Sequence, residues 1–430
     1  MRHVRGFPLQ PQTRHPLRSN YRRARSTGRS TGRSTCAADI AVRIGLGGQP
    51  RNLAGFYLGY FGLIGVILPY LTLYLKDLGL TPYEIGIIMA INPMVKTVAP
   101  GIWGRLADHH GTRRPFLRGA GIGALVTFAA MLLVRDFWGI VLVMVLYSIC
   151  TSSILPLVEA TAMEMVDRLK IDYGKVRMWG SVGFIAASLG MGPVLDQTGS
   201  RVVLWAVLAF LAFNLWSMWL LPDSEAKPEG APTGGLWALL STPHVLAFYA
   251  VCMLMQGSHG TLYGFYSVWL EDLGYSRGTI GLLWAVAVGA EVTALMYSGP
   301  ILSRFGTRRL MIAALALTVL RWGILAVTHQ LGWLIAAQLL HAATFGLFHV
   351  AAVTHTHRMV PEHLRATGQS LYSSLSFGAG LTVGMYLSGT WYESLGAPAL
   401  FAANAAVAVI ALGLALVAAR RPAETAATSR

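Results

Sequence analysis

Residues 75–86 read LKDLGLTPYEIG and residues 270–281 read LEDLGYSRGTIG, so one pattern occurs twice at an offset of 195 residues. The string GTRR at 111–114 recurs at 306–309 with the same offset. Because the offset does not change between the two matches, nothing is inserted between them. Self-similarity of this kind predicts that the chain consists of two homologous halves.

The composition indicates a membrane protein. Of the 430 residues, 54% are hydrophobic and 12% are charged, about half the charged share of a soluble protein. Apolar runs fall near 53–75, 83–104, 115–134, 138–163, 176–195, 201–221, 244–270, 278–302, 310–328, 331–357, 370–391 and 397–419. Lipid offers no hydrogen-bond partners to a backbone, so runs of this length are expected to be membrane-spanning helices. We predict an all-α membrane protein with twelve transmembrane helices, in six-helix halves at 53–221 and 244–420 joined by a cytoplasmic linker at 222–243.

The net charge of +15 is concentrated in one terminal segment. Residues 1–52 contain eleven arginines and a single acid, Asp39. Because this segment is polar and repetitive, we expect a disordered basic tail there, and a second tail at 421–430. A transit peptide, or an N-terminus extended by an early start codon, would have the same composition. The basicity therefore does not favour nucleic-acid binding, and three scattered cysteines do not favour a disulfide framework.

Positive charge differs between the two sets of loops. Outside the tail, one set of alternate loops contains fourteen Lys and Arg residues, and the opposite set contains four, Lys76, Arg135, Arg201 and Arg277. Positive charge in short loops marks the cytoplasmic side. We therefore expect a multi-pass protein of the inner (plasma) membrane with both termini in the cytoplasm.

The segment between the second and third runs resembles a signature of major facilitator transporters. Its gating-motif positions are Gly104, Asp108, Gly111, Arg113 and Arg114. Glycine permits a tight turn, the aspartate can pair with a cation or a helix terminus, and the arginines favour the cytoplasmic side. The resemblance implies the major facilitator fold, with pseudo-two-fold symmetry between the halves. In the second copy Ser303 replaces the aspartate, a departure from the pattern.

A closer resemblance covers most of residues 53–420. The string DYGKVRMWGSVGF, which ends at Phe184, looks like the start of the fifth helix in the proton-coupled phenylpropionate permease family and, more distantly, in lactose permease. Strings that look like the phenylpropionate branch contain Gln256, His259, Tyr263 and Gln338. The resemblance implies a secondary transporter driven by protons, with these residues as candidates for substrate binding.

Lactose permease allows a comparison residue by residue. Glu159 precedes Arg177 by eighteen residues, the spacing of the carboxylate and arginine that bind sugar in that protein. Arg321 and His341 match its coupling arginine and histidine, whereas Thr344 stands where its proton-carrying glutamate is expected. Its charged residues on helices 7 and 10 are replaced by uncharged ones together, which leaves no orphan charge in the membrane.

Ionisable residues inside the predicted spans are Lys96, Glu159, Glu291 and Arg321. A charge at mid-bilayer costs roughly 2.5–3.5 kcal/mol even on insertion scales, so each needs a partner or an aqueous cavity. Lys96 and Glu291 are 195 residues apart, which puts them at equivalent depth in the two halves. We expect Lys96 to bind a substrate carboxylate, and Glu291 to carry the coupling proton with Arg321 and His341. Alternatively, Lys96 and Glu291 form an ion pair that only joins the halves, and Glu159 carries the proton.

Two polar stripes predict a central cavity. One contains Gln256, His259, Tyr263 and Tyr266, and the other contains Gln338, His341, Phe345 and Phe348, both at i, i+3, i+7 and i+10. In the resembled fold these two helices line the central pathway. The aromatic members are also common in bundle cores, and the histidines could be neutral, hydrogen-bonded packing residues.

These observations favour a proton-coupled importer of a small organic anion, in particular an aromatic carboxylate. The alternatives are a sugar or nucleoside symporter, a drug exporter and, from another class, a non-transporting membrane receptor. The sequence contains no P-loop, HExxH or paired-cysteine metal motif, so it gives no indication of an enzyme, of ATP-driven transport or of metal chemistry. The expected partners are a small-molecule substrate, protons and the lipid bilayer, with no cofactor, no metal and no nucleic acid, and the protein is expected to function as a monomer.

Overall fold

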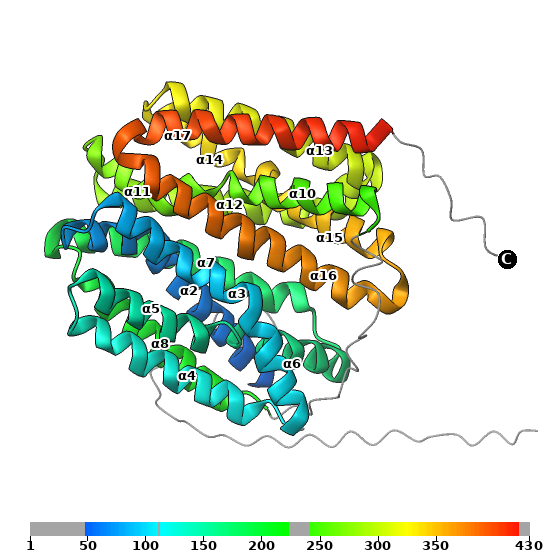
Figure 1. Ribbon diagram of the computed structural model, residues 1–430. Coiled ribbons are helices and arrows are strands. Elements are labelled where there is room, and N and C mark those ends of the chain that lie inside the picture. The colour runs from blue at the N-terminus through cyan, green and yellow to red at the C-terminus, as the bar shows by residue number, and fades with distance from the viewer. Residues whose placement is uncertain (1–47, 111, 223–240, 421–430) are drawn as a thin grey trace, which may run out of the picture. The chain divides into compact units, whose positions relative to one another are not determined.

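The computed structural model describes residues 48–110, 112–222 and 241–420, most of them helical (Figure 1). The first half contains α2 (Gly48–Asp77), α3 (Pro82–His110), α4 (Arg114–Ala129), η1 (Ala130–Leu132), α5 (Phe137–Thr151), α6 (Ile154–Leu169), α7 (Tyr173–Thr198) and α8 (Val202–Leu220). The second half contains α10 (Pro243–Gly257), α11 (Gly260–Asp272), α12 (Arg277–Met296), α13 (Ser298–Val327), α14 (Leu331–Leu339), η2 (Ala342–Leu347), α15 (Phe348–Met359), η3 (Glu362–Leu364), α16 (Arg365–Ser373), η4 (Ser374–Gly380) and α17 (Leu381–Arg420). Most of the predicted N-terminal tail and linker, and the C-terminal tail, lie outside the described residues.

Eleven helical segments of the described chain are long and apolar enough to cross a membrane, against the twelve predicted. The last of them, Glu362–Ala418, has 57 residues, more than twice the ~20 that one crossing needs. It bends at Gly396, where φ is 73°, and Figure 1 shows α17 turning back there from its orange limb to its red limb. The predicted runs at 370–391 and 397–419 lie on either side of this bend.

Several predicted helices are interrupted in the structure. The run at 138–163 is divided into α5 and α6, because Pro156, in the first turn of α6, lacks an N–H and clashes with the carbonyl four residues earlier. The run at 244–270 is divided into α10 and α11 at Ser258, whose hydroxyl donates to a carbonyl of the preceding turn at 2.7 Å. The run at 331–357 passes through η2, which is a π-helix. Hydrophobic periodicity predicted the spans but not these interruptions.

The backbone repeats the symmetry that the sequence predicts. Gly79 follows α2 and Gly274 follows α11, and both glycines have a φ of 85°. After each helix the chain forms the same six-to-one hydrogen bond, with an N–O distance of 3.3 Å in the first half and 3.0 Å in the second. Because a positive φ favours glycine, the repeated string ends both helices in the same way. At its other end α2 starts at Gly48, before the predicted start of the first span at residue 53.

The most extensive contacts between the halves are those of α7 with α12 and of α3 with α17. Contact along α7 and α12 is close. A Cβ atom at Gly281 would lie 2.1 Å from the carbonyl oxygen of Ser188, and one at Gly192 would lie 2.5 Å from the carbonyl oxygen of Arg277. Small residues of this kind let helices approach each other in lipid.

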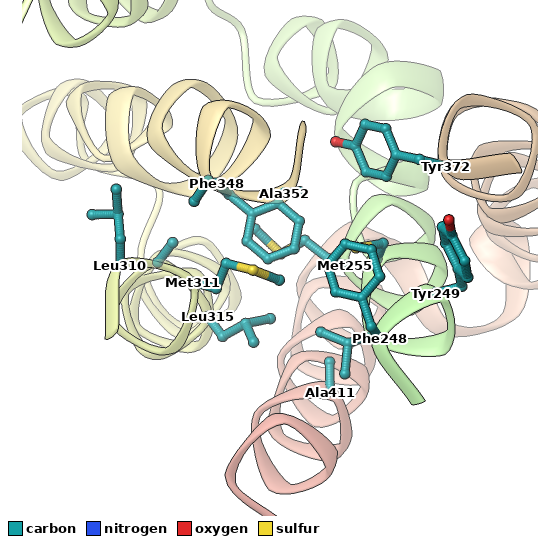
Figure 2. Packing of buried hydrophobic residues seen from close by; sticks show 14 of the residues in the cluster. Phe248, Tyr249, Met255, Leu310, Met311, Leu315, Phe348, Ala352, Tyr372 and Ala411 are labelled. Carbon is teal, nitrogen blue, oxygen red and sulfur yellow. The ribbon is translucent and has the colours of Figure 1, made fainter. Parts of the chain in front are cut away.

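An apolar cluster in the second half is built from α10, α13, α15 and α17, with side chains directed toward a common centre (Figure 2). Phe248 and Met255 come from α10, and Met311 comes from α13. Phe348, which the sequence pattern placed on a polar stripe, is only 5% exposed in this cluster. Phe348 is therefore a core residue, because the π-helix before it rotates the helix relative to a regular 3.6-residue repeat.

Candidate substrate and proton-coupling site

Glu159 of α6 and Arg177 of α7 form an ion pair in the first half. Nε of Arg177 lies 3.7 Å from Oε1 of Glu159, and the Tyr173 hydroxyl donates to Oε2 at 2.6 Å. Asp172 caps α7 by accepting hydrogen bonds from backbone amides of its first turn, which places Tyr173 and Arg177 one turn apart on one face. The guanidinium also lies 4.0 Å from the ring centroid of Phe61. The two charged side chains are 33% and 30% exposed, so a ligand has access to both.

Arg321 of α13 is fully buried, and its hydrogen-bond partners are neutral. Nη1 donates to Nδ1 of His341 at 3.0 Å and to the Thr344 hydroxyl at 3.1 Å, and Nη2 donates to Oε1 of Gln338 at 2.8 Å. The structure therefore brings the predicted coupling residues together, and Thr344 binds the arginine where a glutamate was expected. A buried guanidinium with neutral ligands still needs a counter-charge nearby.

Glu291 of α12 lies on the opposite side of His341 from Arg321. Because arginine only donates hydrogen bonds, Nδ1 of His341 must accept, and the neutral imidazole has its proton on Nε2. Oε2 of Glu291 lies 3.6 Å from this Nε2, within ion-pair distance. The His341 side chain is 6% exposed and that of Glu291 is 21% exposed, so the carboxyl group is the more accessible of the two. The arrangement directs one N–H toward one carboxylate.

The polar stripe of the seventh span is buried. Gln256, His259 and Tyr263 are 6%, 0% and 8% exposed, and Nδ1 of His259 donates to the Met255 carbonyl at 2.9 Å. Within the described part of the chain, Nε2 of His259 and the amide nitrogen of Gln338 have no hydrogen-bond partner. These candidates for substrate binding thus lie inside the second half. His259 and Gln338 each have one polar atom available for a hydrogen bond to a ligand.

Lys96 of α3 does not pair with Glu291, which lies beside a histidine instead. Its side chain is exposed, and no described acidic residue lies within ion-pair distance of the ammonium group. Met94 and Val98, at 52% and 64% exposed, form the outward face of α3. Lys96 points about 160–200° away from them, on the face of the buried Met89. The structure therefore places an unpaired cation on the inward face of the helix.

Two further predicted elements are described in part. Phe184 is 4% exposed and packs its backbone against Gly65 of α2, so it holds α7 to α2. In the gating motif, Gly104 and Asp108 belong to α3, Gly111 lies outside the described residues, and Arg114 begins α4. Arg113 forms an ion pair with Glu164 of α6. In the second copy Gly306 has a φ of 74°, which is the tight turn expected of a glycine there.

A network of ion pairs joins the halves at one end of the bundle, and its members were not among the predicted site residues. Nζ of Lys76 lies 3.0 Å from Oε2 of Glu271 and 2.5 Å from Oδ1 of Asp272. Nη2 of Arg277 lies 2.9 Å from Oδ2 of Asp77 and 2.9 Å from Oε1 of Glu271. Positions 76 and 271 are equivalent in the repeat and have opposite charges, a signal that could have identified the pair.

Two homologous halves of apolar helices, with ionisable groups held inside each half, define a multi-pass membrane transporter. The chain belongs to the MFS_1 like family, whose model matches residues 51–403.

Two relatives and one solved structure describe the relationship further. "Probable 3-phenylpropionic acid transporter" of Escherichia coli (strain K12) is 31% identical over 361 residues, which cover 80% of this chain and 92% of the relative. Maltose permease of Geobacillus stearothermophilus is 30% identical over 361 residues, which cover 80% and 89%. The crystal structure of the nucleoside transporter NupG has a TM-score of 0.77 at 17% identity, covering 87% of this chain and 99% of that one, a likeness of fold alone. These matches confirm the family resemblance drawn from the sequence motifs.

Proposed function

We propose that the protein is a proton-coupled importer of a small organic anion, and that its substrate is an aromatic carboxylate. The observation that supports this most strongly is the exposed ammonium group of Lys96, on the inward face of α3 and without an acidic partner among the described residues. A carboxylate is a favourable ligand for such a group, since it forms a charge-assisted hydrogen bond. The relative named for 3-phenylpropionic acid makes an aromatic acid the first candidate.

Glu291 is the proposed proton carrier. It is the accessible member of the Glu291–His341 pair, and His341 cannot take a second proton while Arg321 donates to its other nitrogen. Protonation of Glu291 removes a negative charge from the site, which makes the surroundings more favourable for a substrate anion. Proton binding and anion binding then strengthen each other, as symport requires.

Glu159 and Arg177 are proposed to contact the substrate from the first half. Both side chains are partly exposed, and Arg177 lies within electrostatic range of Glu291 across the two halves. The guanidinium therefore has two carboxylates nearby, one in each half. A bound anion that draws Arg177 away from Glu159 would couple substrate binding to a movement of α7 against α12.

The ion-pair network of Lys76, Asp77, Glu271, Asp272 and Arg277 is proposed to close the outer end of the pathway. This assignment follows from the loop charges, which favour cytoplasmic termini and put these residues on the opposite side of the inner membrane. The gating motif around Arg113 would then act at the cytoplasmic end. Substrate enters when the network opens and leaves toward the cytoplasm when it closes.

A sugar symporter is the second candidate, and two observations favour it. Maltose permease is a relative at 30% identity, and the Glu159–Arg177 ion pair is present at the spacing that resembles the sugar-binding pair of lactose permease. This candidate gives no role to the unpaired charge of Lys96, because a neutral sugar does not supply a counter-charge.

Uptake into proteoliposomes distinguishes the two candidates. Purified protein is reconstituted, an inward proton gradient is imposed by a pH jump, and uptake of labelled 3-phenylpropionate, maltose and uridine is measured. We expect gradient-dependent accumulation of 3-phenylpropionate alone, above the level of protein-free vesicles. Accumulation of maltose without the acid would contradict the proposal and support the sugar symporter.

A further inference from the structure

Two π-helical segments face each other in the second half. They are η2 and η4, and each carries one phenylalanine, Phe345 and Phe377. The two rings are 6.0 Å apart between centroids, with an interplanar angle of 75°. π-Helices are rare and occur frequently at functional sites, because the extra residue in the turn re-aims the side chains. The two π-helical segments therefore indicate that this ring pair belongs to a functional site.

Two more rings complete a cluster around this pair. His349 lies 5.6 Å from Phe377 and 6.2 Å from Phe345 between centroids, and Tyr372 lies 5.9 Å from Phe377. The Tyr372 hydroxyl and Nδ1 of His349 are hydrogen-bonded at 3.0 Å, which fixes the imidazole in place. Tyr372 also belongs to the apolar core, at whose edge Figure 2 shows it. In this cluster Tyr372 is therefore buried, and the other three rings are half-buried.

One side of this ring cluster adjoins the proposed proton carrier. Phe345 stacks on His341 with centroids 5.1 Å apart and an interplanar angle of 12°. His349 lies within electrostatic range of Glu291, and a Cβ atom at Gly346 would lie 3.2 Å from Cγ of Glu291. A ligand seated against the rings would therefore lie next to the carboxyl group.

The helix that carries Lys96 contacts η4, which contributes Phe377 to the ring cluster. The Ser374 hydroxyl of η4 donates to the carbonyl of Thr97 at 3.2 Å, and a Cβ atom at Gly378 would lie 2.2 Å from the Thr97 hydroxyl oxygen. Phe377 directly precedes Gly378, and Lys96 directly precedes Thr97. The residues that precede Thr97 and Gly378, Lys96 and Phe377, therefore both belong to the turns that form the contact between α3 and η4.

We propose that Phe345, His349 and Phe377, with Tyr372 buried behind them, bind the aromatic ring of the substrate, while Lys96 binds its carboxylate. This assignment rests on the proposed function and names the part of the site that selects a planar ring. Rings arranged edge to face favour a further aromatic ring over a saturated one of similar size. Simple core packing would not leave three of the four rings half-buried.

The test compares two acids that differ only in the ring. Half-saturation concentrations for proton-driven uptake of 3-phenylpropionate and 3-cyclohexylpropionate are measured for the unmodified protein, Phe345→Leu and Phe377→Leu. Leucine keeps an apolar side chain and removes the π-face, so we expect the value for the phenyl acid to rise about tenfold and that for the cyclohexyl acid to change less than about twofold. Phe348→Leu is the matched control, since this ring packs in the core. It should change the half-saturation concentration of neither acid.

Stability is checked in parallel through the shift in melting temperature that each acid produces in detergent. The ring assignment would be overturned if the half-saturation concentration rose equally for both acids, or if it rose for neither acid in both leucine variants. If the unmodified protein takes up neither acid but accumulates maltose, the proposed function itself is wrong, and the ring assignment is wrong with it. Selective loss of the phenyl acid supports both.

Discussion

Arg321 limits what His341 can do with a proton. Its Nη1 occupies Nδ1 of the imidazole, so His341 is restricted to the neutral form with the proton on Nε2, opposite Glu291. A histidine held in this way can orient a proton but cannot store an additional one. In the proposed symport, the proton is therefore assigned to a carboxyl group, and Glu291 lies 3.6 Å from Nε2 of His341.

Glu291→Gln should therefore separate accumulation from exchange. Glutamine keeps the size of the side chain but cannot be protonated, so uptake driven by a pH gradient should be lost. Exchange of labelled against unlabelled substrate should continue at close to the unmodified rate, because exchange needs binding and reorientation without net release of a proton. Both are measured in the same proteoliposomes. If Glu159→Gln has this split phenotype and Glu291→Gln accumulates substrate normally, the proton belongs to Glu159.

Lys96 can be tested for its charge alone. Lys96→Gln removes the ammonium group and should raise the half-saturation concentration for an anionic substrate about tenfold to a hundredfold, the range of a hydrogen bond to a charged group. Lys96→Arg retains the charge and should retain part of the transport, although guanidinium geometry differs. Titration calorimetry of the purified protein with 3-phenylpropionate provides the measurement. An unchanged affinity in Lys96→Gln would remove this residue from the anion site.

At the scale of elements, equivalent positions in the repeat form a contact in one case and not in another. Lys76 and Glu271 are equivalent positions, 195 residues apart, and they form an ion pair of 3.0 Å. Lys96 and Glu291 have the same relationship, yet they do not pair. Symmetry fixes how far along the helices two residues lie, whereas contact also depends on how closely the helices approach at that depth. Periodicity likewise could not predict the π-helices of η2 and η4, because an extra residue in one turn does not change how apolar the span is as a whole.

The ion pair between Lys76 and Glu271 should stabilise the closed end modestly. The two side chains are 34% and 20% exposed, so solvent screens the interaction, and a coupling energy of about 0.5–1 kcal/mol is expected. A double-mutant cycle with Lys76→Gln, Glu271→Gln and the double variant measures it through thermal unfolding in detergent. Lys175→Gln is a matched control, since its partner Asp172 lies 3.9 Å away within one half. If the losses of stability in the two single variants simply add up in the double variant, the pair has no coupling energy and does not stabilise this end of the bundle.

At the scale of the whole molecule, the sequence predicted the fold better than the site. Composition, repeat offset and family motifs were sufficient for the helical halves, because each of these is a property of many residues at once. The Glu159–Arg177 and Arg321–His341 contacts could also be anticipated, through the resemblance to lactose permease. The surroundings of Phe377 and of His349 could not, since they depend on local helix geometry that only coordinates reveal.

The charges inside the bundle predict the electrical behaviour of the transport cycle. Glu159 is bound by Arg177 and by the Tyr173 hydroxyl, whereas Glu291 is the proposed proton carrier. If Glu291 alone carries the proton, as proposed, one proton accompanies one monocarboxylate, and the loaded and empty proteins have the same net charge.

Uptake of 3-phenylpropionate should accordingly respond to the pH gradient and not to the membrane potential. A potassium diffusion potential set with valinomycin, negative inside and without a pH gradient, should drive no accumulation, whereas a pH jump without a potential should. Protein-free vesicles correct for diffusion of the undissociated acid, and Glu291→Gln vesicles correct for leakage caused by the protein. Potential-driven accumulation would mean that a second proton moves, and Glu159 would be its carrier. In that case Glu159→Gln should restore insensitivity to the potential, because removing the second titratable carboxyl group returns the cycle to one proton per anion.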